Sequence, residues 1–108
     1  MDEPIRPDKI DPIVHERVRL AIVSALAVAS SLSFGELKES LDLTDGNLSA
    51  HLQTLEKAGY VKVKKSFRAR RPLTEARLTA KGRRAFTRYL DTLRRLIDDV
   101  DDGDCHAL

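Results

Sequence analysis

The stretch LTDGNLSAHLQTLEKAGY, residues 43–60, decides the fold, because a helical period, a capping signal and an unusual polar face coincide in it. Leu48, Leu52 and Leu55 recur at i, i+4 and i+7, a spacing that places all three on one stripe of an α-helix. Thr44 stands just before the periodic part and is a suitable N-cap. The stretch therefore predicts an amphipathic helix with one buried face.

The opposite face of this helix carries small side chains, neutral hydrogen-bonding side chains and one cation. Its members are Gly46, Asn47, Ala50, Gln53, Thr54 and Lys57. A solvated helix face ordinarily carries charges of both signs, whereas this set has no carboxylate. We therefore expect the face to contact a flat, polar partner.

Length and composition indicate a single domain in a reducing compartment. A chain of 108 residues matches one domain, and a hydrophobic content of 42% supports a modest core. One cysteine permits no disulfide within the chain, as is usual in the cytoplasm. The sequence has no apolar run as long as a membrane span, and its charged start differs from a secretory signal. We expect a cytoplasmic protein without membrane contacts.

Charge is strongly segregated along the chain, although the net charge is only +2. Residues 1–56 hold five Lys/Arg against ten Asp/Glu, residues 57–95 hold fourteen against two, and residues 96–108 hold none against five. A basic block of this size favours a polyanionic partner, and nucleic acid is the commonest one. A solvated basic face is the alternative.

The first part of the chain predicts an arm followed by a helix. Residues 1–11 contain two prolines and no period, which indicates a flexible N-terminal arm. Pro12 suits the first turn of a helix, and residues 14–29 follow with a broad apolar stripe. We expect that stripe to lie in the core.

A second helix should precede the opening stretch. Ser33 and Glu36 have the spacing of a capping box, so a helix is predicted from there to about Leu41. A short turn then leads to the N-cap at Thr44. Two helices joined by such a turn form a helix-turn-helix.

The residues after the stretch predict a β-hairpin with a long loop. Gly59 can adopt the left-handed conformation that ends a helix, and the alternation that follows places Val61 and Val63 on one face of a strand. Residues 65–72 are polar and basic, which predicts an extended loop, and a second alternating strand follows over residues 74–78. The hairpin should therefore carry its cations at the tip.

A long amphipathic helix is predicted for the C-terminal part. Apolar residues between Phe86 and Val100 repeat near the heptad spacing, and Thr79 is a suitable N-cap. Carboxylates after a helix C-terminus oppose its dipole, so we expect fraying at the start of an acidic tail, residues 98–108. The expected fold is mainly α with a small β-hairpin (α+β), in which residues 12–97 form one domain.

The order of these elements resembles that of the winged helix-turn-helix transcriptional regulators of the ArsR and MarR kinds. Residues 15–26 (HERVRLAIVSAL) look like the first helix of those regulators, and residues 48–61 (LSAHLQTLEKAGYV) look like their recognition helix and its exit. Residues 71–84 (RPLTEARLTAKGRR) look like their wing and the start of their last helix. The resemblance implies a dimeric, sequence-specific DNA-binding repressor or activator.

The helix of residues 43–60 has side chains suited to base recognition. A recognition helix places its N-terminal half near the base edges, where Asn and Gln can bond adenine bidentately and small residues permit close approach. The expected base-reading residues are Asn47, Ala50, Gln53 and Thr54. Thr44 and Ser49 either bond phosphate or cap and position the helix. His51 lies at the edge of the apolar stripe, where packing is the expected role.

The cations of the hairpin are expected on the DNA backbone and in the minor groove. Arg68, Arg70 and Arg71 can place a guanidinium in a narrow minor groove. The expected backbone contacts come from Lys57, Lys62, Lys64 and Lys65. A solvated charged hairpin is the alternative.

The last helix offers more apolar surface than a monomer of this size can cover, so we expect a homodimer. The predicted interface residues are Phe86, Tyr89, Leu90, Leu93, Leu96 and Ile97. Two-fold symmetry would place the paired recognition helices about 34 Å apart, on successive major grooves. The alternative is a helix that lies wholly across its own core.

No catalytic or metal-binding motif is visible in the sequence. Metal-sensing members of the resembled family use clustered Cys and His ligands, and the predicted second helix, GELKESLDL, contains neither. Cys105 and His106 supply at most two ligands, too few for a zinc site. The chain also lacks a G-x-S-x-G motif and a phosphate-binding glycine loop. We expect no enzymatic activity, no cofactor and no bound metal.

Two other binding functions make different predictions. A winged helix used as a protein-protein interaction module, without base-specific DNA reading, predicts an exposed apolar patch on the recognition helix and needs no cationic wing. RNA binding usually involves stacking on aromatic rings, and the chain has only three Phe and two Tyr. The sequence favours a regulator that binds double-stranded DNA, with repression as the expected effect.

Overall fold

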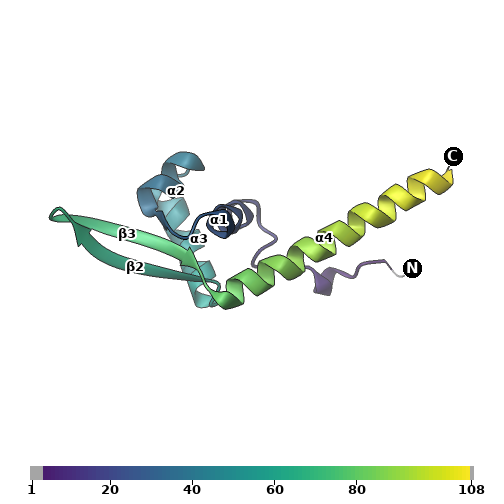
Figure 1. The fold of residues 1–108 in the computed structure, drawn as a ribbon, viewed down its shortest axis with the longest axis horizontal. Coiled ribbons are helices and arrows are strands. Elements are labelled where there is room, and N and C mark those ends of the chain that lie inside the picture. Colours follow the sequence, from purple (N-terminus) through teal and green to yellow (C-terminus); the bar gives the residue numbers. More distant parts are fainter. Residues whose placement is uncertain (1–3, 108) are drawn as a thin grey trace.

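Helices, a small sheet and one long C-terminal helix make up the computed structural model, which describes residues 4–107 and the side chains of residues 4–102. In chain order the elements are η1 (Pro7–Lys9), α1 (Arg17–Val28), β1 (Leu32–Ser33), α2 (Phe34–Ser40), α3 (Asp45–Lys57), β2 (Val61–Arg68), β3 (Arg71–Leu78) and α4 (Ala80–Ala107). Figure 1 shows α1, α2 and α3 gathered in one body, from which the β2–β3 hairpin and α4 extend in opposite directions. The predicted architecture, mainly α with a β-hairpin and a long last helix, is confirmed.

The core lies where the first three α-helices meet the base of the sheet. Its buried side chains are Ile22, Val23, Leu26, Leu37, Leu48, Leu52, Leu55, Val61 and Ala76. The three leucines predicted to form one stripe of α3 are all among them. Burial of each such side chain contributes about 1.5–3 kcal/mol. The leucine stripe therefore fixes which face of α3 points outward.

Capping side chains set the starts of α2 and α3, as predicted. Ser33 Oγ accepts from the amide of Glu36 at 3.0 Å, and a Glu36 carboxylate oxygen accepts from the amide of Ser33 at 2.9 Å, which completes the capping box. Thr44 Oγ1 accepts from the amide of Asn47 at 3.1 Å. Between the two helices Asp42 adopts a φ of 53°, which turns the chain sharply. The predicted helix-turn-helix is confirmed.

The hairpin differs from the sequence prediction, because its strands continue to a two-residue turn. β2 and β3 pair antiparallel along their whole lengths, up to Arg68 opposite Arg71, so the predicted loop over residues 65–72 is wrong. Strand pairing needs only backbone hydrogen bonds, and polar side chains can therefore line a ribbon outside the core. Ala69 and Arg70 form the turn with φ angles of 53° and 67°, values that Gly and Asn usually adopt. For this reason no turn signal is visible in the sequence.

A third strand, which the sequence analysis did not predict, lies beside β3. β1 pairs antiparallel with β3, with Leu32 opposite Ala76, and the strand order is β1-β3-β2. Two residues are too few for an alternating pattern to show. Because β1 leads directly into the capping box of α2, it ties the start of that helix to the hairpin.

Helix α1 begins later than predicted. Asp11 Oδ1 accepts from the two amides that follow Pro12, at 2.8 and 3.3 Å, and so stabilises a turn. The helix starts only after Glu16, whose carboxylate accepts from the amides of its first turn. Two side-chain caps therefore replace the continuous helix expected from Pro12. Val14 still lies in the core, fully buried, but it reaches the core from the turn.

Helix α4 starts at a side-chain cap and runs far beyond the body. Thr79 Oγ1 accepts from the amide of Gly82 at 3.0 Å, which is the predicted N-cap contact. The helix continues to Ala107, so the fraying predicted at residue 98 is wrong; once started, a helix adds one hydrogen bond for each residue fixed. The Cα radius of gyration is 16.9 Å, against about 13 Å for a compact chain of this length. None of the helices in the described part of the chain has the length and apolar character needed to cross a membrane.

Candidate nucleic-acid interface

The outer face of α3 is open to solvent along most of its length. Asn47, Ala50, Gln53 and Lys57 are exposed, whereas Thr54 is half-buried. The Thr54 hydroxyl donates to the carbonyl of Ala50 at 3.2 Å, and its oxygen can still accept a further hydrogen bond. The predicted base-reading residues therefore lie together on one face that a duplex can reach.

This face has two flanks with different neighbours. Asn47 lies toward α1, where it lines a shallow hollow with Arg17 and Leu43. Gln53 lies on the other flank, in a groove of about 310 Å³ between α3 and the hairpin, which Lys65 also lines. The two amide side chains are thus directed to different parts of a bound surface.

The groove between α3 and the hairpin also contains a carboxylate that the sequence analysis did not include. Glu56 lines it together with Ser49, Thr74 and the residues named above. Glu56 follows Gln53 by three positions, so its place on the same flank could have been read from the helical period. A carboxylate here repels phosphate and can accept from the amino group of cytosine.

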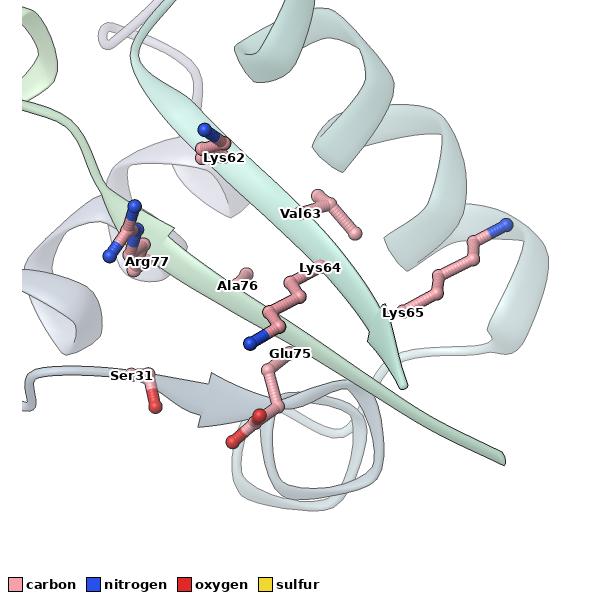
Figure 2. Close-up of a pocket in the computed structure, with 8 residues that line it drawn as sticks. All are labelled: Ser31, Lys62, Val63, Lys64, Lys65, Glu75, Ala76 and Arg77. Atoms are coloured by element: carbon pink, nitrogen blue, oxygen red, sulfur yellow. The ribbon is translucent and has the colours of Figure 1, made fainter. Parts of the chain in front are cut away.

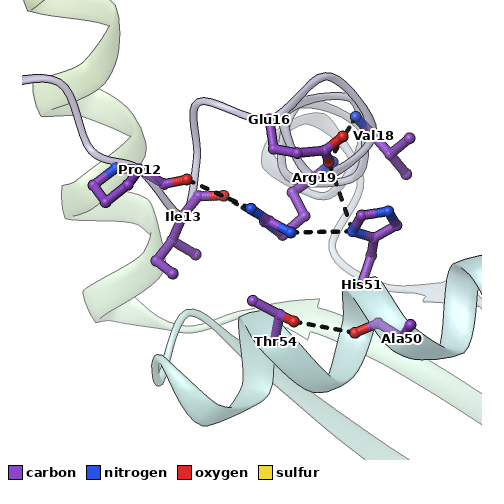
Figure 3. Close-up of polar contacts among 8 residues, drawn as sticks. All are labelled: Pro12, Ile13, Glu16, Val18, Arg19, Ala50, His51 and Thr54. Atoms are coloured by element: carbon purple, nitrogen blue, oxygen red, sulfur yellow. Dashed lines mark hydrogen bonds and ion pairs between the residues drawn. The ribbon is translucent and has the colours of Figure 1, made fainter.

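A polar cluster joins α3 to the start of α1 on the opposite flank (Figure 3). The Arg19 guanidinium lies 3.2 Å from His51 Nδ1 and donates to the carbonyl of Ile13 at 2.7 Å. Glu16 lies 3.6 Å from the same imidazole nitrogen. His51 is therefore a partly buried residue at the boundary of the helix, as predicted, and its side chain is directed toward α1 and away from the outer face.

Glu16 is held ionised by this cluster. Partial burial acts to raise the pKa of its carboxyl group, but the hydrogen bonds from the amides of Arg19 and Val18, and the charges of His51 and Arg19, outweigh burial and lower the pKa. The carboxylate thus caps α1 and lies beside the charge of Arg19 at the same time. The cluster fixes the position of α3 relative to α1.

The hairpin, called the wing from here on, carries its lysines on both faces (Figure 2). The side chains of Lys62 and Lys64 project on the side of Glu75, whereas the side chain of Lys65 projects on the opposite side, where Val63 faces α3. Lys65 and Val63 also border the hollow drawn in Figure 2. The sequence predicts one group of backbone contacts from the three lysines. Strand alternation separates them, because successive side chains point to opposite faces of a sheet. Of the three, only Lys65 lines the groove beside α3.

The tip of the wing is strongly cationic and has one large apolar side chain. Arg68 and Arg71 form the last cross-strand pair, and Arg70 lies in the turn itself. Phe67 precedes this pair and is 75% exposed. The sequence predicts a loop over residues 65–72 and does not identify Phe67 as a contact.

The predicted interface residues of α4 divide into two groups. Tyr89 is only 4% exposed and lies against His15 within the protomer, with 2.8 Å between its hydroxyl oxygen and the imidazole Nδ1. Phe86 packs against the core. These two side chains are therefore used inside the protomer, and they have little surface left for a partner. The later members of the set, Leu90, Leu93, Leu96 and Ile97, are half-buried or exposed.

Metal ligation has no support among the described side chains, which contain no group of three or more His, Cys, Asp or Glu that could hold an ion. The side chains of Cys105 and His106 lie outside the described part of the structure.

Thr44, proposed as a cap or a phosphate contact, acts as a cap. Ser49 is exposed beside the groove and has room for a phosphate oxygen.

Comparisons with known proteins agree with this geometry. Residues 18–97 match the model of the winged helix DNA-binding domain family. An uncharacterised protein of Methanocaldococcus jannaschii is 39% identical over 89 residues, which are 82% of this chain and 97% of that protein. A transcriptional regulator homologue from Pyrococcus horikoshii OT3 is 37% identical, with a TM-score of 0.78 over 82% of this chain and 88% of the other.

More distant structures share the fold. The transcriptional regulator BldR from Sulfolobus solfataricus aligns with a TM-score of 0.64 at 22% identity, over 79% of this chain and 60% of that one. A MarR family regulator from Enterococcus faecalis V583 and a regulator for arsenical resistance align at TM-scores of 0.68 and 0.63, at 24% and 23% identity. The winged helix fold expected from the resemblance to ArsR- and MarR-type regulators is confirmed. The chain belongs to the winged helix DNA-binding domain family.

Proposed function

We propose that this protein is a sequence-specific regulator of transcription that binds double-stranded DNA as a homodimer, with α3 in the major groove and the wing on phosphate and in the minor groove. The observation that carries the proposal is the placement of Gln53 on the outer flank of α3 and Lys65 on the wing in one groove. A neutral hydrogen-bonding group beside a cation suits the junction between base edges and backbone.

Base reading is assigned to Asn47, Ala50, Gln53 and Thr54. The two amides can bond adenine in the major groove, and the small Ala50 between them permits close approach of the helix to the duplex. Thr54 lies at the edge of this face and can add a hydrogen bond to a base, since its hydroxyl oxygen remains free to accept one. Lys57 lies at the C-terminal end of the same face and is suited to phosphate.

Backbone and minor-groove contacts are assigned to the side of the wing that faces α3 and to its tip. Lys65 extends along the groove, and Arg68, Arg70 and Arg71 surround the turn. A guanidinium is attracted by the negative potential of a narrow minor groove. Lys62 and Lys64, on the far face of the wing, are expected to contribute only through the long-range field.

The dimer is proposed to form through the outer part of α4. Leu90, Ile97 and Val100 are 40%, 59% and 59% exposed. Leu96, Ile97 and Val100 also line a shallow hollow together. Apolar side chains in a row along an isolated helix are typical of a coiled-coil seam. A second copy of α4 would cover this row.

The charges of α4 favour an antiparallel pair. Its first half is basic, with Arg83, Arg84 and Arg88 among its cations, and four aspartates follow over residues 98–102. A parallel pair would place like charges side by side, whereas an antiparallel pair places the acidic end of each helix beside the basic half of the other. The two-fold axis then crosses α4, and such a dimer has the two-fold symmetry that matches a pseudo-palindrome.

Repression is the expected effect on transcription. A dimer whose recognition helices occupy two successive major grooves covers about one helical turn between them and excludes other proteins from the same duplex. The occluding dimer needs no separate enzymatic activity for this effect.

The proposed function is tested by selecting bound duplexes from a random-sequence pool with the full chain. We expect enrichment of a pseudo-palindromic sequence, and specific binding about 10³-fold or more tighter than binding to an unrelated duplex. Single-stranded DNA and RNA of the enriched sequence serve as competitors. A pool that shows no enrichment, or equal competition by the single strand, would contradict the proposal.

A further inference from the structure

Phe67 is a large aromatic side chain that the fold leaves in solvent. It is 75% exposed, and its cross-strand neighbour is Pro72, which is exposed as well. A cross-strand pair can stabilise a hairpin, but a ring with this exposure is covered very little by its neighbour. The exposure of the ring therefore indicates that it contacts a partner outside the protomer.

The direction of Phe67 is set by strand alternation. Val63, Lys65 and Phe67 follow one another at every second position of β2, so they share one face of the wing. Val63 and Lys65 line the groove beside α3, and Figure 2 shows both directed toward that side of the wing. Phe67 thus projects from the same side, roughly 7 Å farther toward the tip than Lys65.

The surroundings of Phe67 are cationic. Arg68, Arg70 and Arg71 follow it around a two-residue turn, which keeps the end of the wing as narrow as two strands. An apolar docking surface for another protein would be expected to have further apolar neighbours. Phe67 instead forms, with Pro72, a small apolar point at a cationic tip. Arg70 lies in the turn, and Arg68 and Arg71 pair on the opposite face of the wing, so the narrow tip presents positive charge on the side away from the ring, and this charge is complementary to DNA.

We propose that Phe67 is a wedge that enters the minor groove of bound DNA, partly unstacks one base step and bends the duplex. Apolar side chains at the end of minor-groove elements act in this way, while neighbouring arginines hold the phosphates on either side. The bend adds sequence preference at the unstacked step, since pyrimidine–purine steps unstack more readily than others. This inference rests on the proposed DNA-binding function.

The test uses the full chain and the duplex enriched by the selection experiment, labelled at both ends for energy transfer and carrying 2-aminopurine at successive minor-groove positions. With the unsubstituted chain we expect closer duplex ends and a rise of 2-aminopurine fluorescence at one step. Phe67→Ser should abolish both signals and weaken binding by about tenfold. Phe67→Leu, which keeps an apolar wedge, should retain most of the bend.

Val28→Ser is the matched control, because Val28 is also apolar and is 92% exposed, but lies at the end of α1. It should leave bend and affinity unchanged, and melting curves should show both serine variants folded. If the Phe67→Ser variant binds and bends the duplex as the unsubstituted chain does, the proposal that Phe67 acts as a wedge is wrong, while the DNA-binding function stands. If Phe67→Ser weakens binding only to single strands, the ring stacks on unpaired bases and the wedge is likewise wrong. If the unsubstituted chain binds no duplex, the proposed function itself fails.

Discussion

Gly82 lies directly against the carbonyl oxygen of Tyr60, so that a β-carbon at position 82 would stand 2.1 Å from that oxygen. The same carbonyl accepts from the amide of Thr79 at 3.0 Å, and the Thr79 hydroxyl donates to the carbonyl of Gly59 at 2.6 Å. The exit of the recognition helix and the start of α4 are therefore joined backbone to backbone. This contact sets the direction in which α4 leaves the body.

Gly82→Ala should destabilise the protein by about 1–3 kcal/mol, because the backbone must shift to admit the methyl group. Chemical denaturation measures the free energy of unfolding. Gly46→Ala is the control, since a β-carbon there meets nothing within 4 Å and alanine favours a helix by up to about 1 kcal/mol. Equal effects of the two substitutions would show that the close approach at Gly82 does not constrain the fold.

Gln53→Ala and Asn47→Ala should relax sequence preference more than they weaken non-specific binding. A good bidentate contact gives about 1–3 kcal/mol of discrimination against a wrong base, whereas an amide facing a base edge adds little to binding of random DNA. Affinities for the enriched duplex and for single-base variants of it measure the difference. Equal losses on enriched and random duplexes would remove these two residues from base reading.

The salt dependence of binding should distinguish the two faces of the wing. If Lys65, Arg68, Arg70 and Arg71 each meet a phosphate, the slope of log affinity against log salt is about −3.6 per subunit. Lys65→Gln should reduce the magnitude of this slope by about 0.9. The double substitution of Lys62→Gln and Lys64→Gln should reduce the slope by less. A larger effect of the double change would place DNA on the far face of the wing.

Ile97→Asp should convert the proposed dimer into a monomer. Ile97 is 59% exposed, so the charge costs the protomer little, but a second α4 would bury it unpaired. Sedimentation at micromolar concentration measures the mass, and Thr87→Asp on an exposed position of the same helix is the control. A monomeric unsubstituted chain would contradict the dimer.

The hydroxyl of Tyr60 donates to Asp11 at 2.5 Å, which joins the N-terminal segment to the exit of α3. Burial, the hydrogen bond to Asp11 and the charge of Asp11 raise the pKa of Tyr60 to about 12, against an opposing effect of Arg88. Because the folded pKa lies above the unfolded value of 10.0, this contribution to stability is complete below pH 10 and is lost as the pH rises toward 12.

Absorbance titration of a Tyr89→Phe variant follows Tyr60 alone, since the chain has two tyrosines. Asp11→Asn keeps an oxygen for the turn amides but removes the charge, so it should lower the Tyr60 midpoint. An unchanged midpoint would show that burial alone raises the pKa.

The sequence by itself determined the local elements. The leucine period of α3, the capping box at Ser33 and the caps at Thr44 and Thr79 depend on residues a few positions apart, and all four occur in the structure. Burial of the leucines then fixed the outward face of α3, which made Asn47 and Gln53 candidates before any contact was known.

Only the tertiary structure decided the shape of the wing, the residue at which α1 starts and the side chain that Tyr89 of α4 contacts. The wing depends on pairing between strands, so a tight turn at Ala69 and Arg70 exists without turn-forming residues. The strand register that results places Lys65 and Phe67 on the face of the wing that Val63 shares. Helix α1 starts late because Asp11 stabilises a turn before it and Glu16 then caps its first turn. Tyr89 lies in the protomer because His15 meets it across 74 positions of sequence. Such contacts join distant residues, and periodicity reports only near neighbours.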